Sequence, residues 1–485
     1  MSIKGKKVQA QVSTNNVGPN FDQVRRFWQS PKVEQALVSA DIESSIAHVR
    51  MLGATGIVHQ QIATDVVLAL EQLRREFADG GSFLQPGDAD IHTGIQRRLE
   101  EIVGELAPVL NVAKSHNDHI ATDIRLWLRD AIIDILNKMT DLRQLFLQLA
   151  ERDQEAIMPG YTHMQPALPI LLSHWWLANE ARVQRDFARL MDCYKRLNVS
   201  PLGSGQLAGS KQPIDRDMTA KALGFDQAME NSLDAVSDRD YVVEFTSFAA
   251  LLGTHLSQMS SELLLWSTNE FAMVRLPRAF VFRSQSMPQK RNPEMLEILR
   301  SRPSAVIGRL TQFLTELKGL PLSYCHDLQE SLPALLETVN DIRFILELTM
   351  ELLPALHFDT DRMRYLATAD LTNASNVVDY LVERGISNDK SAKIVESLVN
   401  YCRDRNRQLM DLTLNEWALF HPGFDEQIYT YLNLEESIDS RSSFGGTATE
   451  QVENARHRAT LLLENERKAL SNLAAKRLNC LDNDG

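Results

Sequence analysis

The hydrophobic positions in the middle of the chain recur at intervals of three and four residues over long distances. Apolar residues keep this spacing through residues 245–266 and 328–346. The spacing continues, with one extra step of four, through residues 124–149, and a looser version follows Pro169. Such spacing places side chains on one face of a helix, and its persistence is typical of long helices packed side by side. The pattern predicts a bundle of long helices.

The regions on either side show shorter helical patterns. Residues 1–112 contain short helical segments after an irregular start, and the chain from residue 365 contains short segments interrupted by Gly385, Pro422 and a glycine pair. We find no convincing two-residue alternation of a strand and no internal repeat. The sequence predicts an all-α protein of three helical domains, at 1–112, 113–364 and 365–485.

Composition limits the range of partners. The 485 residues are 44% hydrophobic and 24% charged, and the formal net charge is −13. A negative charge argues against nucleic acid or an anionic membrane as a partner, but not against a small anion held by local charges. The four cysteines are far apart, we see no secretory signal, and no run approaches 18 apolar residues. We expect a cytoplasmic protein with free thiols.

The most informative polar segment is residues 283–297. Two prolines prevent a continuous helix there, and Ser284, Lys290 and Asn292 lie close to them. Asn292 followed by Pro293 predicts the capping residue and the first residue of a helix. A helix N-terminus beside a lysine and an amide attracts an anion such as a carboxylate. An ordinary solvated loop with a helix cap is equally compatible with these residues.

Other polar clusters lie where the helical pattern stops. They begin at Asp90, Lys114, Met158, Ser237 and Tyr324. No histidine pair has metal-ligand spacing such as HxxxH, so no metal site is predicted. Together, these segments rich in Ser, Thr, Asn, His and Lys favour a shared site for an anionic substrate. Taken singly, a cap or an ordinary polar position explains Ser115, Asp238, His92, His116 and His163.

Several of these segments also resemble a known protein family. The string Met-Pro-Gln-Lys-Arg-Asn-Pro at 287–293 is highly specific to the fumarase/aspartase superfamily, and the flanking strings favour its argininosuccinate lyase branch. The resemblance covers nearly the whole chain. It is carried by residues 90–93, 117–118, 122–127, 159–163, 201–205, 237–240, 287–293, 318–321, 327–330 and 445–448.

The resemblance implies an all-α fold of three domains, a homotetramer built on the central helices, and active sites formed where three subunits meet. It implies a reversible β-elimination without a cofactor, in which a base removes a proton from a succinyl group, the C–N bond breaks and fumarate leaves. Because that proton is weakly acidic, the enzyme must stabilise the aci-carboxylate formed on its removal. The expected partner is a small anionic N-succinyl substrate.

The same resemblance implies roles for single residues. Ser284 matches the catalytic serine of a mobile loop, taken as the base, and Lys290 is placed to stabilise its alkoxide. His163 matches the histidine on the opposite side of the substrate, supported by Glu297. The expected substrate-binding residues are Ser30, Ser115, Asn117, Thr162, Asn292, Tyr324, Gln329, Arg239, His92 and Thr93.

Some positions depart from the usual argininosuccinate lyase sequence. Leu332 stands where the family places a substrate-contacting lysine, and it suits the apolar face of its helix. His116 replaces an arginine, and Arg283 replaces a glycine, which removes backbone freedom. Cys325 and His326 replace more usual polar or basic residues. Argininosuccinate is the default substrate, and the alternatives are a lyase for a different N-succinyl amine and a non-catalytic relative like the lens crystallins.

Overall fold

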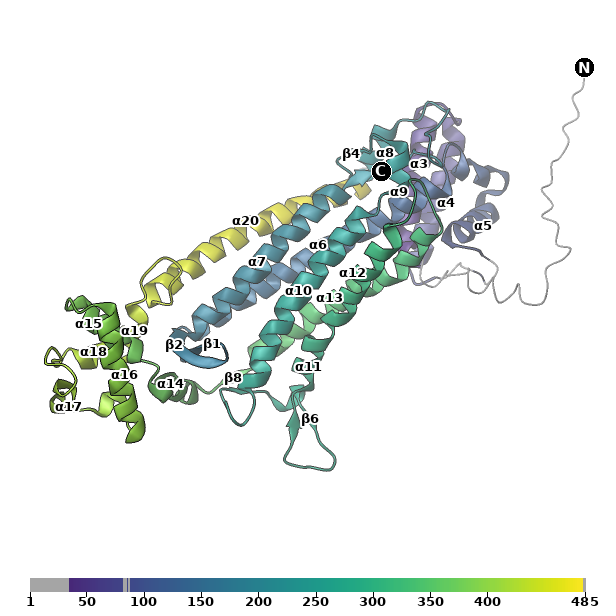
Figure 1. The fold of residues 1–485 in the computed structure, drawn as a ribbon. Helices are drawn as coiled ribbons and strands as arrows, with labels where there is room; N and C mark the ends of the chain where they lie inside the picture. Colours follow the sequence, from purple (N-terminus) through teal and green to yellow (C-terminus); the bar gives the residue numbers. More distant parts are fainter. Residues whose placement is uncertain (1–34, 82–84, 86–87, 483–485) are drawn as a thin grey trace, which may run out of the picture.

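The computed structural model describes residues 35–81, 85 and 88–482. They form an elongated, mostly helical body in which long helices lie between two groups of shorter ones (Figure 1). The prediction of an all-α fold with a long central bundle is confirmed. Ser30, one of the expected substrate-binding residues, lies outside the described residues.

The shorter N-terminal helices gather at one end of the bundle, drawn in purple and blue in Figure 1. Their buried apolar side chains, such as Ile42, Leu70 and Ile95, join the hydrophobic core of the bundle. The elements are η1 (Gln35–Leu37), α3 (Val38–Ala54), α4 (Gln60–Ala78), α5 (Ile91–Val103) and η2 (Gly104–Asn111).

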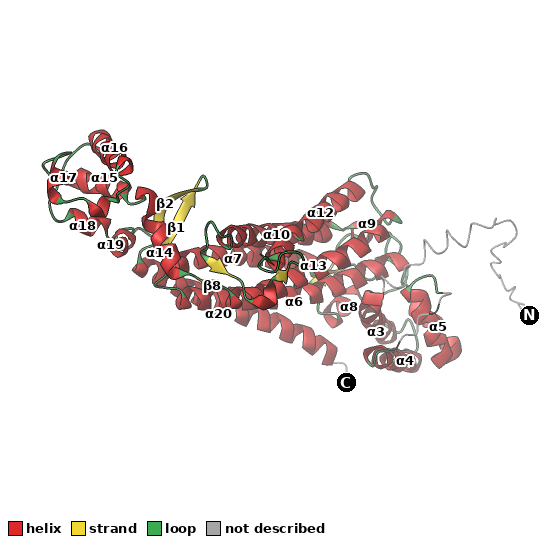
Figure 2. Cartoon of the chain, turned by 90° about the horizontal axis from the view of Figure 1, so that it is seen from below, coloured by secondary structure: helices red, strands yellow, loops and turns green. Residues whose placement is uncertain are grey.

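The bundle consists of long helices that lie side by side (Figures 1 and 2). Apolar residues predicted to face neighbouring helices, such as Phe245, Leu256 and Leu335, are buried. Within the described residues, no helix combines the length and apolar character needed to cross a membrane. The bundle helices are α6 (His116–Arg152), α7 (Leu172–Leu197), α10 (Asp240–Trp266), α11 (Glu294–Ser301), α12 (Pro303–Leu317) and α13 (Asp327–Ala355).

Short strand pairs and helices connect the bundle helices. Three pairs are antiparallel and the pair β3–β4 is parallel. The segment at 158–166, expected to be a simple turn, belongs to the hairpin β1–β2. The connecting elements are β1 (Ile157–Thr162), β2 (Gln165–Leu171), β3 (Val199–Ser200), α8 (Arg216–Ala222), β4 (Gln227–Ala228), α9 (Ser232–Ser237), β5 (Val274–Arg275), η3 (Arg278–Phe280), β6 (Phe282–Arg283), β7 (Arg291–Asn292) and β8 (His357–Phe358).

The C-terminal region forms a small helical lobe and then returns along the bundle. The lobe has a core of its own around Tyr380 and Trp417. The expectation of only shorter helices after residue 365 is wrong, because α20 (Thr449–Asp482) is a long helix packed on α6 and α7. The lobe contains α14 (Thr360–Thr368), η4 (Ala369–Leu371), α15 (Ala374–Glu383), α16 (Asn388–Asp404), η5 (Leu409–Asp411), α17 (Leu414–Ala418), α18 (Ile428–Leu432) and α19 (Leu434–Asp439).

Candidate active site

The predicted site residues in the described chain fall into three groups. The hairpin group, on the β6–β7 hairpin and α11, is Ser284, Lys290, Asn292 and Glu297. The turn group, at the tip of β1–β2, is Thr162 and His163. The helix-start group, at or near the beginnings of α5, α6, α10 and α13, is His92, Thr93, Ser115, Asn117, Arg239, Tyr324 and Gln329. The first two groups lie at one end of the bundle and the third lies at the other (Figure 1).

Ser284 lies at the neck of the β6–β7 loop. Its backbone N–H donates to the Lys290 carbonyl at 3.3 Å, which closes the loop. Its Oγ accepts a hydrogen bond from the Met287 N–H at 3.2 Å and lies 3.4 Å from the Ser286 Oγ. Hydrogen bonds to the charged form of a group favour that form, so the Met287 N–H favours loss of the Ser284 hydroxyl proton. The Lys290 side chain is exposed on the same loop.

The predicted capping role of Asn292 is wrong. Asn292 lies in β7, paired with Phe282, and α11 begins at Glu294 without a side-chain cap. A residue before a proline is driven toward extended backbone, which explains the strand. The Asn292 amide donates to Glu294 Oε1 at 3.5 Å. Because Glu294 and Glu297 place two carboxylates in the first turn of α11, this terminus attracts an anion less than the sequence suggested.

His163 occupies a strained turn. Thr162 pairs with Gln165, so His163 and Met164 form a two-residue hairpin loop. Their φ angles are 53° and 61°, in the left-handed region that a type I′ turn requires and that Asn-Gly usually fills. Side chains with a β-carbon raise the free energy of this conformation, and such strain is typical of functional sites. The turn leaves the His163 side chain exposed.

Capping interactions fix the start of α6. Ser115 caps the helix, because its Oγ accepts the Asn117 N–H at 3.4 Å and Asp118 accepts the Ser115 N–H at 2.9 Å. The helix therefore begins at His116, before the apolar run from Ile120 that marked its expected start. The Asn117 side-chain amide donates to the Gln206 carbonyl at 3.0 Å. The simpler explanation of Ser115 as a helix cap is confirmed.

A glycine loop is held against the start of α6. Asp118 Oδ2 accepts the N–H groups of Gly203 and Gly205, each at 2.9 Å. Gly205 has a φ of 62°, and a β-carbon added there lies 2.9 Å from the Gly209 carbonyl oxygen. Only glycine fits this conformation and this space. Through these hydrogen bonds, Asp118 holds residues 201–205, one of the segments that carry the family resemblance, close to its chain neighbour Asn117.

His92, His116 and Tyr324 are brought together at this end. The ring centroids of His92 and His116 are 4.7 Å apart, and those of His116 and Tyr324 are 6.2 Å apart. Burial lowers the pKa of His116, and the charge of His92 lowers it further. His116 is therefore uncharged at neutral pH. This face of the helix-start group carries a neutral ring.

The remaining helix-start residues have local roles. Thr93 lies in the first turn of α5, which begins at Ile91, and its hydroxyl donates to Asp90 Oδ1 at 2.7 Å. Arg239 caps α10, is buried, and donates to the Asp238 carbonyl at 2.7 Å. The sequence suggested Asp238 as the cap of this helix, but Arg239 occupies the cap position and Asp238 lies one residue before it. Gln329 is half-buried in the first turn of α13.

The length of the bundle separates the groups within one chain. α10 begins beside Arg239 and spans 27 residues, which is about 40 Å at 1.5 Å per residue. The β6–β7 loop with Ser284 follows the far end of α10 (Figure 1). α6 spans 37 residues between Asn117 and the hairpin of His163, about 55 Å. One chain alone therefore cannot place all three groups around one substrate.

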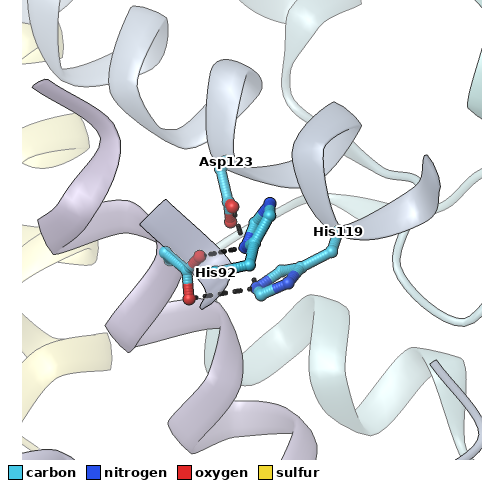
Figure 3. Close-up of side chains that lie close together, drawn as sticks. His92, His119 and Asp123 are labelled. Carbon is cyan, nitrogen blue, oxygen red and sulfur yellow. Dashed lines mark ion pairs between the residues drawn. The ribbon is translucent and has the colours of Figure 1, made fainter. Parts of the chain in front are cut away.

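Sequence reasoning missed a buried group beside the helix-start residues. Asp41 of α3, His92 of α5, and His119 and Asp123 of α6 offer ligand-type atoms within 4.8 Å of one another (Figure 3). The available signal was the four-residue spacing of His119 and Asp123, which puts both on one helix face. Asp41 and His92 carry no such signal, because only the fold brings α3 and α5 against α6.

Charges within this group shift its pKa values. Burial disfavours a charge on His92, but the carboxylate of Asp41, which contacts its Nδ1, acts together with those of Asp123 and Asp90 to outweigh burial and raise the pKa of His92 to about 9. Burial raises the pKa of Asp123 and lowers those of His119 and Lys114. Both ring nitrogens of His92 are buried. His92 thus directs its polar atoms into the protein.

Comparison with known proteins identifies the family. Residues 18–308 match the family described as Lyase, and residues 371–439 match the one described as Argininosuccinate lyase C-terminal. An argininosuccinate lyase from Synechococcus sp. (strain JA-3-3Ab) is 42% identical over 443 residues, which are 91% of this chain and 91% of that protein. The chain belongs to the argininosuccinate lyase family. It is therefore a carbon–nitrogen lyase that releases fumarate.

Other members of this family and its structural neighbours agree. The argininosuccinate lyase of Syntrophus aciditrophicus (strain SB) is 40% identical and covers 90% of this chain and 92% of its own. An EDDS lyase variant with bound fumarate has a TM-score of 0.82 at 25% identity, over 96% of this chain and 94% of its own. Fumarate lyase from Mesorhizobium sp. BNC1 shares the fold, with a TM-score of 0.71 at 19% identity over 90% and 97% of the two chains.

The positions that depart from the argininosuccinate lyase pattern have clear places in the structure. Leu332 is 4% exposed and lies in the core of the bundle, so it is a packing residue as the spacing predicted. Arg283 lies in β6, paired with Arg291. Cys325 and His326 lie just before α13, and Cys325 is a free thiol. His116 contacts the rings of His92 and Tyr324, and the His326 carbonyl accepts the Gln329 N–H at 2.9 Å.

Proposed function

We propose that the protein converts argininosuccinate to arginine and fumarate. The observation that carries the proposal is the β6–β7 loop, which keeps Ser284, the Met287 N–H that donates to its Oγ, and Lys290 on one segment. The substrate is supported by the argininosuccinate lyases that share 40–42% identity with this chain over about nine-tenths of its length.

In the proposed reaction, the Ser284 hydroxyl first loses its proton to solvent, and the resulting Oγ alkoxide acts as the base. It takes the proton from the succinyl carbon next to a carboxylate, and the electron pair left behind moves onto that carboxylate to give the aci form. Lys290 and the backbone N–H of Met287 stabilise the negative charges on the serine oxygen and the substrate. The electrons then return, the C–N bond breaks, and the leaving amine takes a proton from the side of His163. Atoms and charge balance without a cofactor.

We also propose that the working enzyme is a homotetramer in the cytoplasm. Support for assembly comes from the separation of the three groups, because sites built from several copies bring opposite bundle ends together. Support for the compartment comes from Cys193, Cys325 and Cys402, which are free thiols in the structure. The family of this chain does not depend on its assembly state or on its compartment.

The proposed substrate is tested by following fumarate absorbance in the ultraviolet when purified enzyme receives argininosuccinate. Ser284→Ala should lower kcat by roughly a hundredfold to ten-thousandfold, the usual contribution of a positioned acid or base. The control is Ser304→Ala, whose hydroxyl donates to the Ser301 carbonyl on the bundle surface, and it should retain full activity. Equal activity of the two variants rules out Ser284 as the base.

A lyase for a different N-succinyl amine is the second candidate, favoured by one observation. Neutral His116, which contacts the helix-start group, and buried Leu332 stand where the argininosuccinate branch usually provides cations. Loss of a charge-assisted hydrogen bond costs about 1.5–3 kcal/mol, enough to change which amine is preferred. Adding various amines to fumarate in the reverse direction distinguishes the candidates. Rapid addition of another amine, with no turnover of argininosuccinate, supports the second.

A further inference from the structure

Two carboxylates and two imidazoles converge where the N-terminal helices meet the bundle. We call Asp41, His92, His119 and Asp123 the Asp–His cluster (Figure 3). His119 Nε2 lies 3.4 Å from Asp41 Oδ1 and 3.7 Å from Asp123 Oδ2, and His92 Nδ1 contacts Asp41 Oδ2. Ligands around a tetrahedral zinc ion at its usual bond lengths are about 3.3–3.5 Å apart. The two distances from His119 are therefore close to those of a metal site, and the ligand-type atoms of all four residues lie within 4.8 Å of one another.

Two serines orient the carboxylates of the Asp–His cluster. Ser44 Oγ donates to Asp123 Oδ1 at 2.7 Å, and Ser45 Oγ donates to Asp41 Oδ1 at 3.3 Å. In each carboxylate, Oδ1 is thus held by a hydroxyl group, while Asp41 Oδ2 contacts His92 Nδ1 and Asp123 Oδ2 makes no hydrogen bond with any described residue. Hydroxyl groups that fix the direction of carboxylates are typical of the surroundings of metal ligands.

Several polar atoms of the cluster lack the hydrogen bonds that buried atoms normally make. Asp123 Oδ2 is buried and accepts no hydrogen bond from any described residue. His92 Nε2 is likewise buried without a partner in the part of the chain that the structure describes. An unsatisfied buried polar group destabilises the folded state. Two such atoms in one cluster indicate a ligand among them.

We propose that the Asp–His cluster binds one divalent transition-metal ion of the zinc type, which joins α3, α5 and α6 beside the helix-start group. The mixed set of two imidazoles and two carboxylates suits Zn²⁺ or Co²⁺, whereas Mg²⁺ and Ca²⁺ prefer oxygen ligands alone. The two carboxylates balance the charge of one divalent ion. This proposal differs from the sequence-based expectation of no metal, and it assigns the ion a structural role outside the elimination reaction.

Lys114 lies beside the cluster and interacts with the charges of Asp41 and Asp123, so a positive charge on it opposes a bound cation. Its Nζ lies 3.5 Å from His119 Nε2 and 3.3 Å from Ser45 Oγ, so its ammonium neutralises part of the cluster's negative charge. Ligation also requires neutral imidazoles, so the proton held by His92 leaves to solvent when the ion binds. In the alternative explanation the cluster binds no ion, and the positive charge of Lys114 balances its carboxylates instead. Lys114 therefore distinguishes the two explanations.

The first experiment measures metal binding by the full-length protein. Protein stripped with a chelator is titrated with CoCl₂, and with ZnCl₂ followed by elemental analysis. We expect one ion per chain, visible absorption bands of tetrahedral Co²⁺, and a higher melting temperature with Zn²⁺. His119→Gln and Asp123→Asn should each lose the bands. The matched control is His255→Gln, which removes a histidine paired with the buried Asp186 elsewhere in the bundle, and it should keep them.

The second experiment uses Lys114→Gln, checked for folding by circular dichroism. If the cluster is a metal site, removing the ammonium of Lys114 should tighten Co²⁺ binding by tenfold or more, roughly the effect of one unfavourable charge contact. If Lys114 is the natural counter-ion, the variant melts at a lower temperature and Zn²⁺ does not restore it. That result, or wild-type protein that retains no ion and shows no Co²⁺ bands, overturns the proposal.

Discussion

Arg239 and Ser284 lie beyond opposite ends of α10. Arg239 caps the N-terminus of this helix, and the loop that carries Ser284 follows its C-terminus. The helix is about 40 Å long, so two residues expected to serve one small substrate are far apart in one chain. Under the proposed function, a complete site therefore requires ends from different copies.

Two inactive variants that are changed at opposite ends of the bundle should therefore regain activity when their subunits assemble together. Ser284→Ala and Asn117→Ala, each nearly inactive alone, should regain fumarate release after joint unfolding and reassembly, because some sites receive an intact loop and an intact α6 start. Mixing Ser284→Ala with Lys290→Ala is the control. Both changes lie on the same loop, so every site keeps a defect and no recovery is expected. Recovery in both mixtures contradicts the shared site.

Replacing Met164 tests the strain in the turn of His163. Met164 is 65% exposed with a φ of 61°, so its side chain contributes little packing while its β-carbon disfavours the conformation. Met164→Gly should raise the free energy of unfolding by about 1 kcal/mol. Urea denaturation measures the change. Met164→Val, with a branched β-carbon, should lower stability, and an unchanged midpoint in both variants indicates that the turn is not strained.

Arg143 joins three helices in the buried bundle. Its Nε donates to Glu180 of α7 at 2.8 Å, and its Nη1 contacts Glu466 of α20. Arg143→Met leaves both carboxylates without a cation and should lower the free energy of unfolding by about 3–5 kcal/mol. Lys195→Met breaks an exposed pair with Asp192 and should cost at most about 1 kcal/mol by the same denaturation assay. Equal losses of unfolding free energy in the two variants contradict the conclusion that the buried Arg143 links the three helices.

His48 should make the protein sensitive to acid. Burial and the charge of Lys114 lower the pKa of His48 from 6.5 to about 3. Between these values the unfolded chain binds a proton that the folded chain does not, so stability is present above pH 6.5 and falls as the pH decreases toward 3. The loss from this residue is about 2 kcal/mol at pH 5.

The variant His48→Gln isolates this effect. Its amide can still donate to the Val112 carbonyl, which His48 Nε2 contacts at 2.8 Å, but it does not titrate. The difference in unfolding free energy between pH 7 and pH 5 should shrink by about 2 kcal/mol relative to the unchanged protein. An identical pH dependence in both proteins shows that His48 is not the group responsible.

Local sequence signals predicted some features well and others poorly. The long helices were predictable because side-chain spacing of three and four persists through elements such as α10 and α13. The β1–β2 hairpin was missed because its central residues, His163 and Met164, lack the glycine or asparagine that usually marks such a turn. Asn292 was misplaced because a strand pairing with Phe282 overrode a local capping pattern.

The sequence by itself determined the helical bundle, the family and the polar segments that carry the expected chemistry, because periodicity and short motifs depend on neighbours along the chain. Only the tertiary structure decided which segments meet. It showed that Ser284 and Asn117 lie at opposite ends of the bundle, and that Asp41, on a helix far from His119 in sequence, completes a buried cluster with it. Contacts of this kind arise from packing between helices, which local spacing does not encode.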